Sequence, residues 1–237
     1  LAEPHLNAEQ RRRVQERLDQ ALAAIPIDQE KKAAKEGVAL PAPTLDGFTL
    51  TGVTLAVLRR LRESAVEKRA AAGPPSDMRT ALSADGELLR APRNAGEVLT
   101  TADVCFEVVK PATAARQCSF AELDAAPGES GPATAFVSHA WLYPFEWLVS
   151  ALEAANLPAD TLFWFDVAVV NQHVNADRGF DWWSSTFRQA VKTIGRTLLV
   201  LAPWTAPVPL TRAWCIWEIF CTVDTDTELR VLLPAAE

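Results

Sequence analysis

The sequence is poor in the residues that mark several functional classes. It has only four cysteines in 237 residues, none in a Cys-x-x-Cys pair, which argues against a disulfide framework or a four-cysteine zinc site. The net charge of −7 argues against nonspecific binding to nucleic acid. There is no apolar run of membrane-spanning length and no signal-peptide pattern. These absences predict a soluble, cytoplasmic protein with free thiols and no membrane or nucleic-acid partner. Leu1 in place of an initiating Met predicts a piece of a longer protein.

The composition changes near residue 130. All eight tryptophans lie at position 141 or later, whereas most of the basic side chains lie before residue 130. The segment 126–132, which is rich in Pro and Gly, has the composition of a linker. We therefore divide the chain into a helical N-terminal region, residues 1–130, and a second domain, residues 131–237.

Helical patterns dominate the N-terminal region. Apolar residues at helical spacing predict helices over 7–25 and 54–72, separated by a loop over 31–49. A short helix is predicted over 102–110, capped by Thr101 and ended by Pro111. Ser119 and Glu122 form a capping box for another short helix. No catalytic constellation appears here, so we expect a helical cap or spacer packed on the second domain.

Strands and helices alternate in the second domain. Apolar runs predict strands over 134–138, 162–169, 197–202 and 229–233, with helices over 144–155, 181–194 and 211–223 between them. Such alternation is typical of an α/β fold with a mostly parallel sheet of about four to five strands and helices on both faces.

Polar and aromatic side chains gather where the predicted strands end. Ligands of open α/β sheets bind at the carboxyl ends of the strands, where helix N-termini and crossover loops meet. Glu218 stands in an otherwise apolar and aromatic run, and a carboxylate in such surroundings needs a partner or a function. The sequence therefore predicts a tryptophan-rich site at this edge of the sheet. The candidate residues are Ser138, His139, Trp141, Asp166, Trp204, Arg212, Trp214 and Glu218.

The order of these segments resembles a TIR (Toll/interleukin-receptor) domain over about residues 133–237. The segment 136–139 (Phe-Val-Ser-His) is similar to the end of the first TIR strand, and 163–166 (Phe-Trp-Phe-Asp) to an aromatic strand that ends in Asp. The segment 211–219 matches Trp, Cys, Glu and the final aliphatic residue of the TIR motif Ser-x-Trp-Cys-x-x-Glu-Leu. Together with 101–105 (Thr-Ala-Asp-Val-Cys), these segments also resemble a group of algal and protist proteins, a likeness that implies no activity.

The TIR resemblance implies a flavodoxin-like sheet and a nucleotide site. In enzymatic TIR domains, the glutamate that matches Glu218 is the catalytic residue of an NAD glycohydrolase, so the resemblance implies that role for Glu218, with NAD as a substrate and no cofactor. A carboxylate beside the ribose can stabilise the oxocarbenium-like state in which the nicotinamide–ribose bond breaks. Ser138, Asp166 and Arg212 would orient the ribose or the phosphates, and Trp141 or Trp204 would stack on a base.

Two other interpretations remain open at this stage. Many TIR domains are scaffolds, so the chain would then be a non-enzymatic signalling module that acts through self-association or a protein partner. The second alternative is a metal-assisted hydrolase. His139, Asp166 and His173 have side chains suited to metal binding, although their spacing does not require a shared site.

Overall fold

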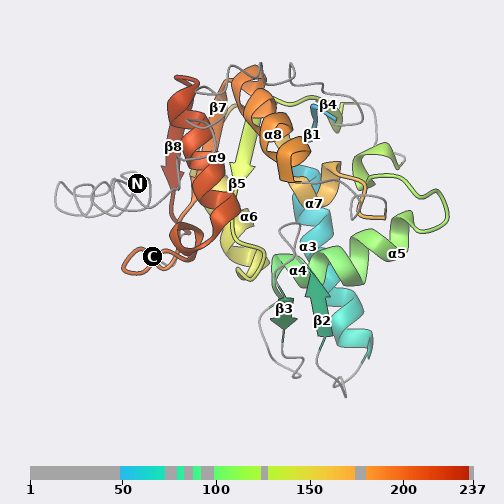
Figure 1. Ribbon diagram of the computed structural model, residues 1–237. Helices are drawn as coiled ribbons and strands as arrows, with labels where there is room; N and C mark the ends of the chain where they lie inside the picture. The colour runs from blue at the N-terminus through green and yellow to red at the C-terminus, as the bar shows by residue number, and fades with distance from the viewer. Residues whose placement is uncertain are drawn as a thin grey trace.

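The computed structural model describes residues 49–72, 79–82, 88–91, 99–123, 128–173 and 180–234. These residues form a mixed six-stranded sheet with flanking helices (Figure 1). The strands of this sheet are β1 (Thr51–Val53), β4 (Ser130–Pro132), β5 (Ala135–Ser138), β6 (Phe163–Trp164), β7 (Arg196–Val200) and β8 (Glu228–Leu232). A separate hairpin joins β2 (Arg79–Leu82) to β3 (Leu88–Ala91). The α/β class predicted from the sequence is therefore confirmed.

The strand order in the sheet is β4-β1-β6-β5-β7-β8. Strands β6, β5, β7 and β8 are mutually parallel, whereas β1 runs antiparallel to both β4 and β6. The chain crosses from β5 to β6 in one direction and from β6 to β7 in the other. The carboxyl ends of β5 and β7 consequently flank the point where the winding reverses.

Helices cover the parallel strands on both sides. Helix α6 (Phe145–Ala154) connects β5 to β6, α8 (Phe180–Ile194) connects β6 to β7, and α9 (Ala213–Asp224) connects β7 to β8. Helices α8 and α9 pack against each other in front of the strands in Figure 1. The connection from β5 through α6 to β6 runs across the sheet in the opposite direction to the connection from β6 through α8 to β7. Because both crossovers are right-handed, α6 lies on the opposite face of the sheet from α8. There it contacts α3 (Leu55–Ala72).

The sheet extends further than the sequence predicted. Strand β1 lies in the region predicted to be helical, and β4 lies within the predicted linker, so the sheet has six strands instead of four to five. Both strands have three residues, which is too short for the alternation that marks a strand in a sequence. Gly52 permits close packing here, because a Cβ at this position would come within 2.8 Å of the backbone carbon of Leu162.

Replacement of Gly52 by Ala should destabilise the edge of the sheet. The added methyl group would meet backbone atoms of Leu162 and Ala133, which cannot rotate away as a flexible side chain would. We expect a loss of about 1–3 kcal/mol in the free energy of unfolding, measured by urea denaturation. The same substitution at Gly131, whose nearest neighbour is a Leu162 side-chain carbon at 3.0 Å, should cost less. Equal losses at the two positions would contradict this explanation.

The predicted strand over 162–169 was wrong in its second half. Strand β6 and the following Phe165 are extended, but residues 166–169 form the short helix α7 (Asp166–Val169). A short apolar run fits a buried strand and a buried helix equally well. Val167, Ala168 and Val169 are fully buried. Asp166 is therefore the first residue of helix α7, two residues after the end of β6, and does not lie within a strand.

Two elements of the N-terminal region follow the predicted pattern closely. Helix α3 matches the helix predicted over 54–72, and Phe120–Glu122 forms the short 3-10 helix η2 behind the predicted capping box. The predicted helix over 7–25 and almost all of the loop over 31–49 lie outside the described residues.

The helix predicted over 102–110 is longer than expected. It comprises α4 (Thr101–Val104), the π-helix η1 (Cys105–Val109) and α5 (Lys110–Thr113), with Thr100 as its cap in place of Thr101. Pro111 does not end it. The Lys110 N–H bonds to the Cys105 carbonyl in the π register, and Pro111 then falls in the first turn of α5, where a missing N–H is tolerated.

Ion pairs attach α3 to the rest of the fold. Arg59 pairs with Glu153 at 2.7 Å, Arg62 pairs with Glu146 at 3.1 Å, and Arg60 pairs with Glu129. These pairs are partly exposed, so each contributes at most about 1 kcal/mol. Most of the attachment comes from the apolar face of α3, where Val57, Leu58, Leu61 and Ala65 are buried in the main core.

Candidate functional site

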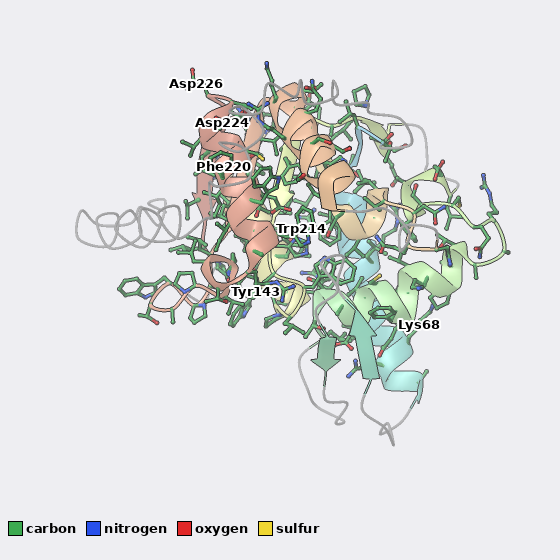
Figure 2. The ribbon with its side chains drawn as sticks, viewed as in Figure 1. Lys68, Tyr143, Trp214, Phe220, Asp224 and Asp226 are labelled. Atoms are coloured by element: carbon green, nitrogen blue, oxygen red, sulfur yellow. The ribbon has the colours of Figure 1, made fainter. Side chains whose placement is uncertain are left out.

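Ser138 and Glu218 meet between β5 and α9. Ser138 is the last residue of β5 and is fully buried. Its hydroxyl donates a hydrogen bond to Oε2 of Glu218 at 2.5 Å. In Figure 2, the labels Trp214 and Asp224 mark the start and the far end of α9. The start of α9 contacts the residue after β5, because the Cys215 thiol donates to the His139 carbonyl. The partly buried Glu218 carboxylate therefore lies toward the carboxyl ends of the strands.

The position of Glu218 follows from where α9 begins. Strand β7 is followed by a proline-rich loop and the 3-10 helix η4 (Val208–Thr211). Arg212 then adopts an extended conformation as the N-cap of α9, so Thr211, the cap predicted from the sequence, lies one residue too early. Glu218 is in the second turn of α9. The hydroxyl of Thr222, one turn further along α9, donates a hydrogen bond to the Glu218 carbonyl at 2.7 Å.

Asp166 forms a second cluster with Trp141 and His139. The indole N–H of Trp141 donates to Oδ2 of Asp166 at 2.7 Å, and the Val167 backbone N–H donates to Oδ1 at 2.7 Å. Nε2 of His139 lies 3.9 Å from Oδ1. The Asp166 side chain is 25% exposed, whereas that of His139 is 2% exposed. In this cluster, the Asp166 carboxylate is therefore accessible to solvent, whereas the neighbouring His139 imidazole is buried.

The loop after β5 joins the two clusters. Ser138 and His139 are adjacent in the chain, and the Cys215 thiol on α9 donates to the His139 carbonyl at 3.3 Å. The backbone N–H groups of Thr101 and Ala102 in α4 donate to the carbonyls of Tyr143 and Trp141, at 3.0 and 2.9 Å. Segments from β5, α9 and α4 therefore converge on residues 138–143.

Burial lowers the pKa of His139. Desolvation of the charged ring is the largest cause and the charge of Arg212 adds to it, while Asp166 and a hydrogen bond to the Val137 backbone act in the opposite direction. The imidazole is therefore neutral near pH 7. Its charged form is disfavoured in the fold but not in the unfolded chain.

This shift of the pKa gives the stability a pH dependence. Because the folded pKa lies below the unfolded value of 6.5, the unfolded chain takes up a proton first as the pH falls. The free energy of unfolding should therefore decrease below pH 6.5, by up to about 1.4 kcal/mol per pH unit from this residue. Urea titrations of the wild type and of His139→Gln across this range will test this. An unchanged slope in the variant would contradict it.

Tyr143 is a residue of this region that the sequence did not single out. Its hydroxyl bonds to the Ala202 carbonyl and accepts from the Ala202 N–H at 2.7 Å. Its ring is buried and meets the Trp147 ring edge to face at 5.7 Å. It thereby fixes the loop after β7 to the loop after β5. The only signal in the sequence is that this is the single tyrosine.

Replacement of Tyr143 by Phe should loosen this junction without creating a large cavity. Two buried backbone groups of Ala202 would lose their hydroxyl partner, which costs about 1–3 kcal/mol in the free energy of unfolding. Hydrogen exchange of the Ala202 amide should accelerate more than that of Leu198, within β7, because the change is local. Equal acceleration at both amides would argue against a local role.

The other predicted residues lie in different surroundings. Trp214 packs against Phe187 of α8 with ring centroids 5.5 Å apart. Trp204 is partly buried in the turn after β7, and Arg212 is the N-cap of α9.

The three metal candidates do not come together. Nε2 of His173 lies 2.8 Å from the Thr113 hydroxyl on α5, while His139 lies beside Asp166. Within the part of the chain that the structure describes, no group of three or more His, Cys, Asp or Glu side chains could hold a metal ion.

Comparison with known proteins adds no family assignment. No protein-family model, curated protein or solved structure matches the chain. No helix among the described residues is long and apolar enough to cross a membrane.

Proposed function

We propose that this chain is a TIR-like α/β domain that binds NAD and cleaves its nicotinamide–ribose bond. The observation that carries the proposal is the hydrogen bond between Ser138 and Glu218 at the carboxyl end of β5. It places an oriented carboxylate at the position where open α/β sheets bind nucleotides.

The order of the parallel strands supports this proposal. Counted along the chain, β5 to β8 lie in the spatial order second, first, third and fourth. This is the order of flavodoxin-like sheets, whose ligands bind beside the first and third strands, here β5 and β7. Residues 139–143 follow β5 and residues 201–204 follow β7, and Tyr143 joins the two segments.

The chemistry requires one carboxylate and a position for water. As the bond between the ribose C1′ and the nicotinamide nitrogen breaks, the electron pair leaves with nicotinamide and positive charge develops on the ribose. Glu218 would stabilise that charge, and water would then add to C1′ and release a proton. The Ser138 hydroxyl orients the carboxylate, which reduces the reorganisation needed in the transition state.

Other candidate side chains would supply the binding contacts. Arg212, at the N-terminus of α9, would contact the phosphates, because a guanidinium binds phosphate oxygens through two hydrogen bonds. Asp166 and Trp141 would contact polar groups of the nucleotide. Trp204 and Trp214 would offer ring faces to a base, although Trp214 would have to leave part of its contact with Phe187 to do so.

The proposal is tested by incubating the purified chain with NAD and measuring free nicotinamide by liquid chromatography. We expect release that is linear in protein concentration and absent from heat-denatured protein. No release at high protein concentration would contradict the proposal. If light scattering then showed concentration-dependent assembly, the result would favour a non-enzymatic signalling module.

A further inference from the structure

Strand β8, at the edge of the sheet, has one covered face and one face that is partly open. Leu232 is buried on the covered face. On the other face, Val231 is paired in register with Leu199, which belongs to the apolar cluster under α9. Alternate residues of a strand share a face, and parallel strands are normally covered on both faces. The side chains on the α9 side of β8 are only partly buried, and they are Leu229, Val231 and Leu233.

The outer side of α9 continues this apolar surface. Ile216, Phe220 and Val223 are spaced by four and three residues, so they form one stripe along the helix. Val223 is 58% exposed, and the other two are partly buried. Trp214, which contacts Phe187 of α8, lies on the opposite side of the helix. In Figure 1, α9 lies between α8 and β8, so the stripe faces the side of β8. We call these six apolar residues the α9–β8 surface.

Carboxylates lie at one end of the α9–β8 surface. Asp224 is the last residue of α9, and Asp226 follows in the turn before β8 (Figure 2). Asp224 and Glu228 each have an arginine partner, Arg188 and Arg196 respectively. Asp226 is exposed, and no described residue forms an ion pair with it. A group that covers the surface should therefore be apolar, with a cation at this end.

The segment 7–25 of the same chain has the matching pattern. It lies outside the described residues and is predicted to be helical. Arg11 and Arg17 stand three residues before and three residues after Val14, so in a helix they flank its side chain. The basic end of the segment thus matches the acidic end of the surface. The apolar residues of the segment recur at helical spacing, and they are Val14, Leu18, Leu22 and Ile25.

The chain is long enough to place this segment on the surface. Thr49 lies at the end of β6, because its carbonyl accepts from the indole of Trp164. Strand β8 is three strands away from β6, a distance of about 14 Å. The 23 residues from 26 to 48 can extend over about 75 Å. The segment can therefore reach the surface without leaving its own chain.

We propose that residues 7–25 dock as an amphipathic helix on the α9–β8 surface of the same chain. The helix runs antiparallel to α9, with Val14 beside Val223 and the flanking arginines toward Asp226. It covers the open face of the edge strand, as helices do where a sheet edge would otherwise be exposed. The inference rests neither on the binding nor on the cleavage of NAD.

The test is disulfide cross-linking of the full chain. Cys118 is replaced by Ser in every variant, because the other three cysteines are buried. Val14→Cys with Val223→Cys should form an intrachain disulfide under mild oxidation at least about tenfold faster than Val14→Cys with Val66→Cys, because docking raises the effective concentration of the pair. Val66 is the matched control, since it is 53% exposed on α3, away from the surface.

A second control tests the direction of the helix. Ile25 is eleven residues from Val14, about 16 Å along a helix, so Ile25→Cys with Val223→Cys should also react slowly. Equal rates in the three pairs, or no intrachain disulfide in any of them, would overturn the inference. Cross-linked dimers on a non-reducing gel would assign the surface to a second copy of the chain and would overturn it as well.

Hydrogen exchange tests the same contact without added cysteines. A free helix of this length is marginally stable, so the amides of residues 14–25 should lose protection by at least about tenfold in Val223→Asp. In Val66→Asp their protection should stay at the wild-type level. Circular dichroism shows whether both variants are folded. Equal protection of the segment in the two folded variants would overturn the inference.

Discussion

Glu218→Gln should lower the rate of nicotinamide release from NAD by about 10²–10³-fold, the range seen when one preorganised electrostatic contact to a transition state is removed. Glutamine keeps the shape of the side chain and can still accept from the Ser138 hydroxyl, which lies 2.5 Å from Oε2. It removes only the negative charge that would stabilise the ribosyl cation. Initial rates by liquid chromatography, at NAD concentrations above and below KM, will show whether kcat carries the loss, as the mechanism requires.

Glu146→Gln is the matched control for this prediction. Glu146 lies on α6 with a 57% exposed side chain, and its partner is Arg62 at 3.1 Å. Its replacement should leave the rate within about twofold, because a surface ion pair contributes little to the fold and this one is not part of the site. Equal rates in wild type and Glu218→Gln, with both proteins folded, would exclude Glu218 as the catalytic residue.

Trp164→Ala should have the largest effect on stability, a loss of about 3–5 kcal/mol in the free energy of unfolding. Trp164 is 1% exposed and stacks on Phe136 with ring centroids 4.7 Å apart. Its ring also meets Phe187 of α8 edge to face at 5.5 Å. Removing the indole thus leaves a cavity between β5, β6 and α8. The packing of these three elements supports the sheet beneath the candidate site. Urea denaturation followed by circular dichroism measures the loss.

Trp164→Phe distinguishes the packing of the ring from its hydrogen bond. Phenylalanine keeps much of the stack but cannot donate to the Thr49 carbonyl, which the indole N–H reaches at 2.8 Å. The loss should therefore be clearly smaller than for Ala, about 1–2 kcal/mol. If both variants lose the same free energy, the ring stack is not what stabilises this layer.

Much of the helical framework could be predicted from the residues themselves. Helices α3, α6, α8 and α9 have long apolar periodicities and clear stop signals, and the structure places them within a few residues of the predicted bounds. Shorter elements were missed because their signal is tertiary. Strand β1 exists because it pairs with β4 and β6, and α7 is helical although its apolar run is equally compatible with a strand.

The candidate site could be predicted only in part, for the same reason. Glu218 stood out as a carboxylate in an aromatic run, but its contact with Ser138 spans 80 positions in the chain. That contact depends on the order of β5 and β7 in the sheet. The bond of Trp141 to Asp166 and the role of Tyr143 depend on the path of one loop, for which the sequence offers no periodicity. Residue type alone groups His173 with His139, whereas the fold places His173 beside Thr113.

The central claim is that the Glu218 carboxylate faces the ribose of a bound nucleotide. The most direct measurement is a crystal structure of the chain with a carbocyclic NAD analogue whose nicotinamide bond cannot be cleaved. We predict the nucleotide at the carboxyl ends of β5 and β7, with a Glu218 oxygen within hydrogen-bond reach, about 2.6–3.2 Å, of the hydroxyls on the nicotinamide-side sugar ring. A nucleotide bound elsewhere, or one whose sugar does not approach Glu218, would contradict the account.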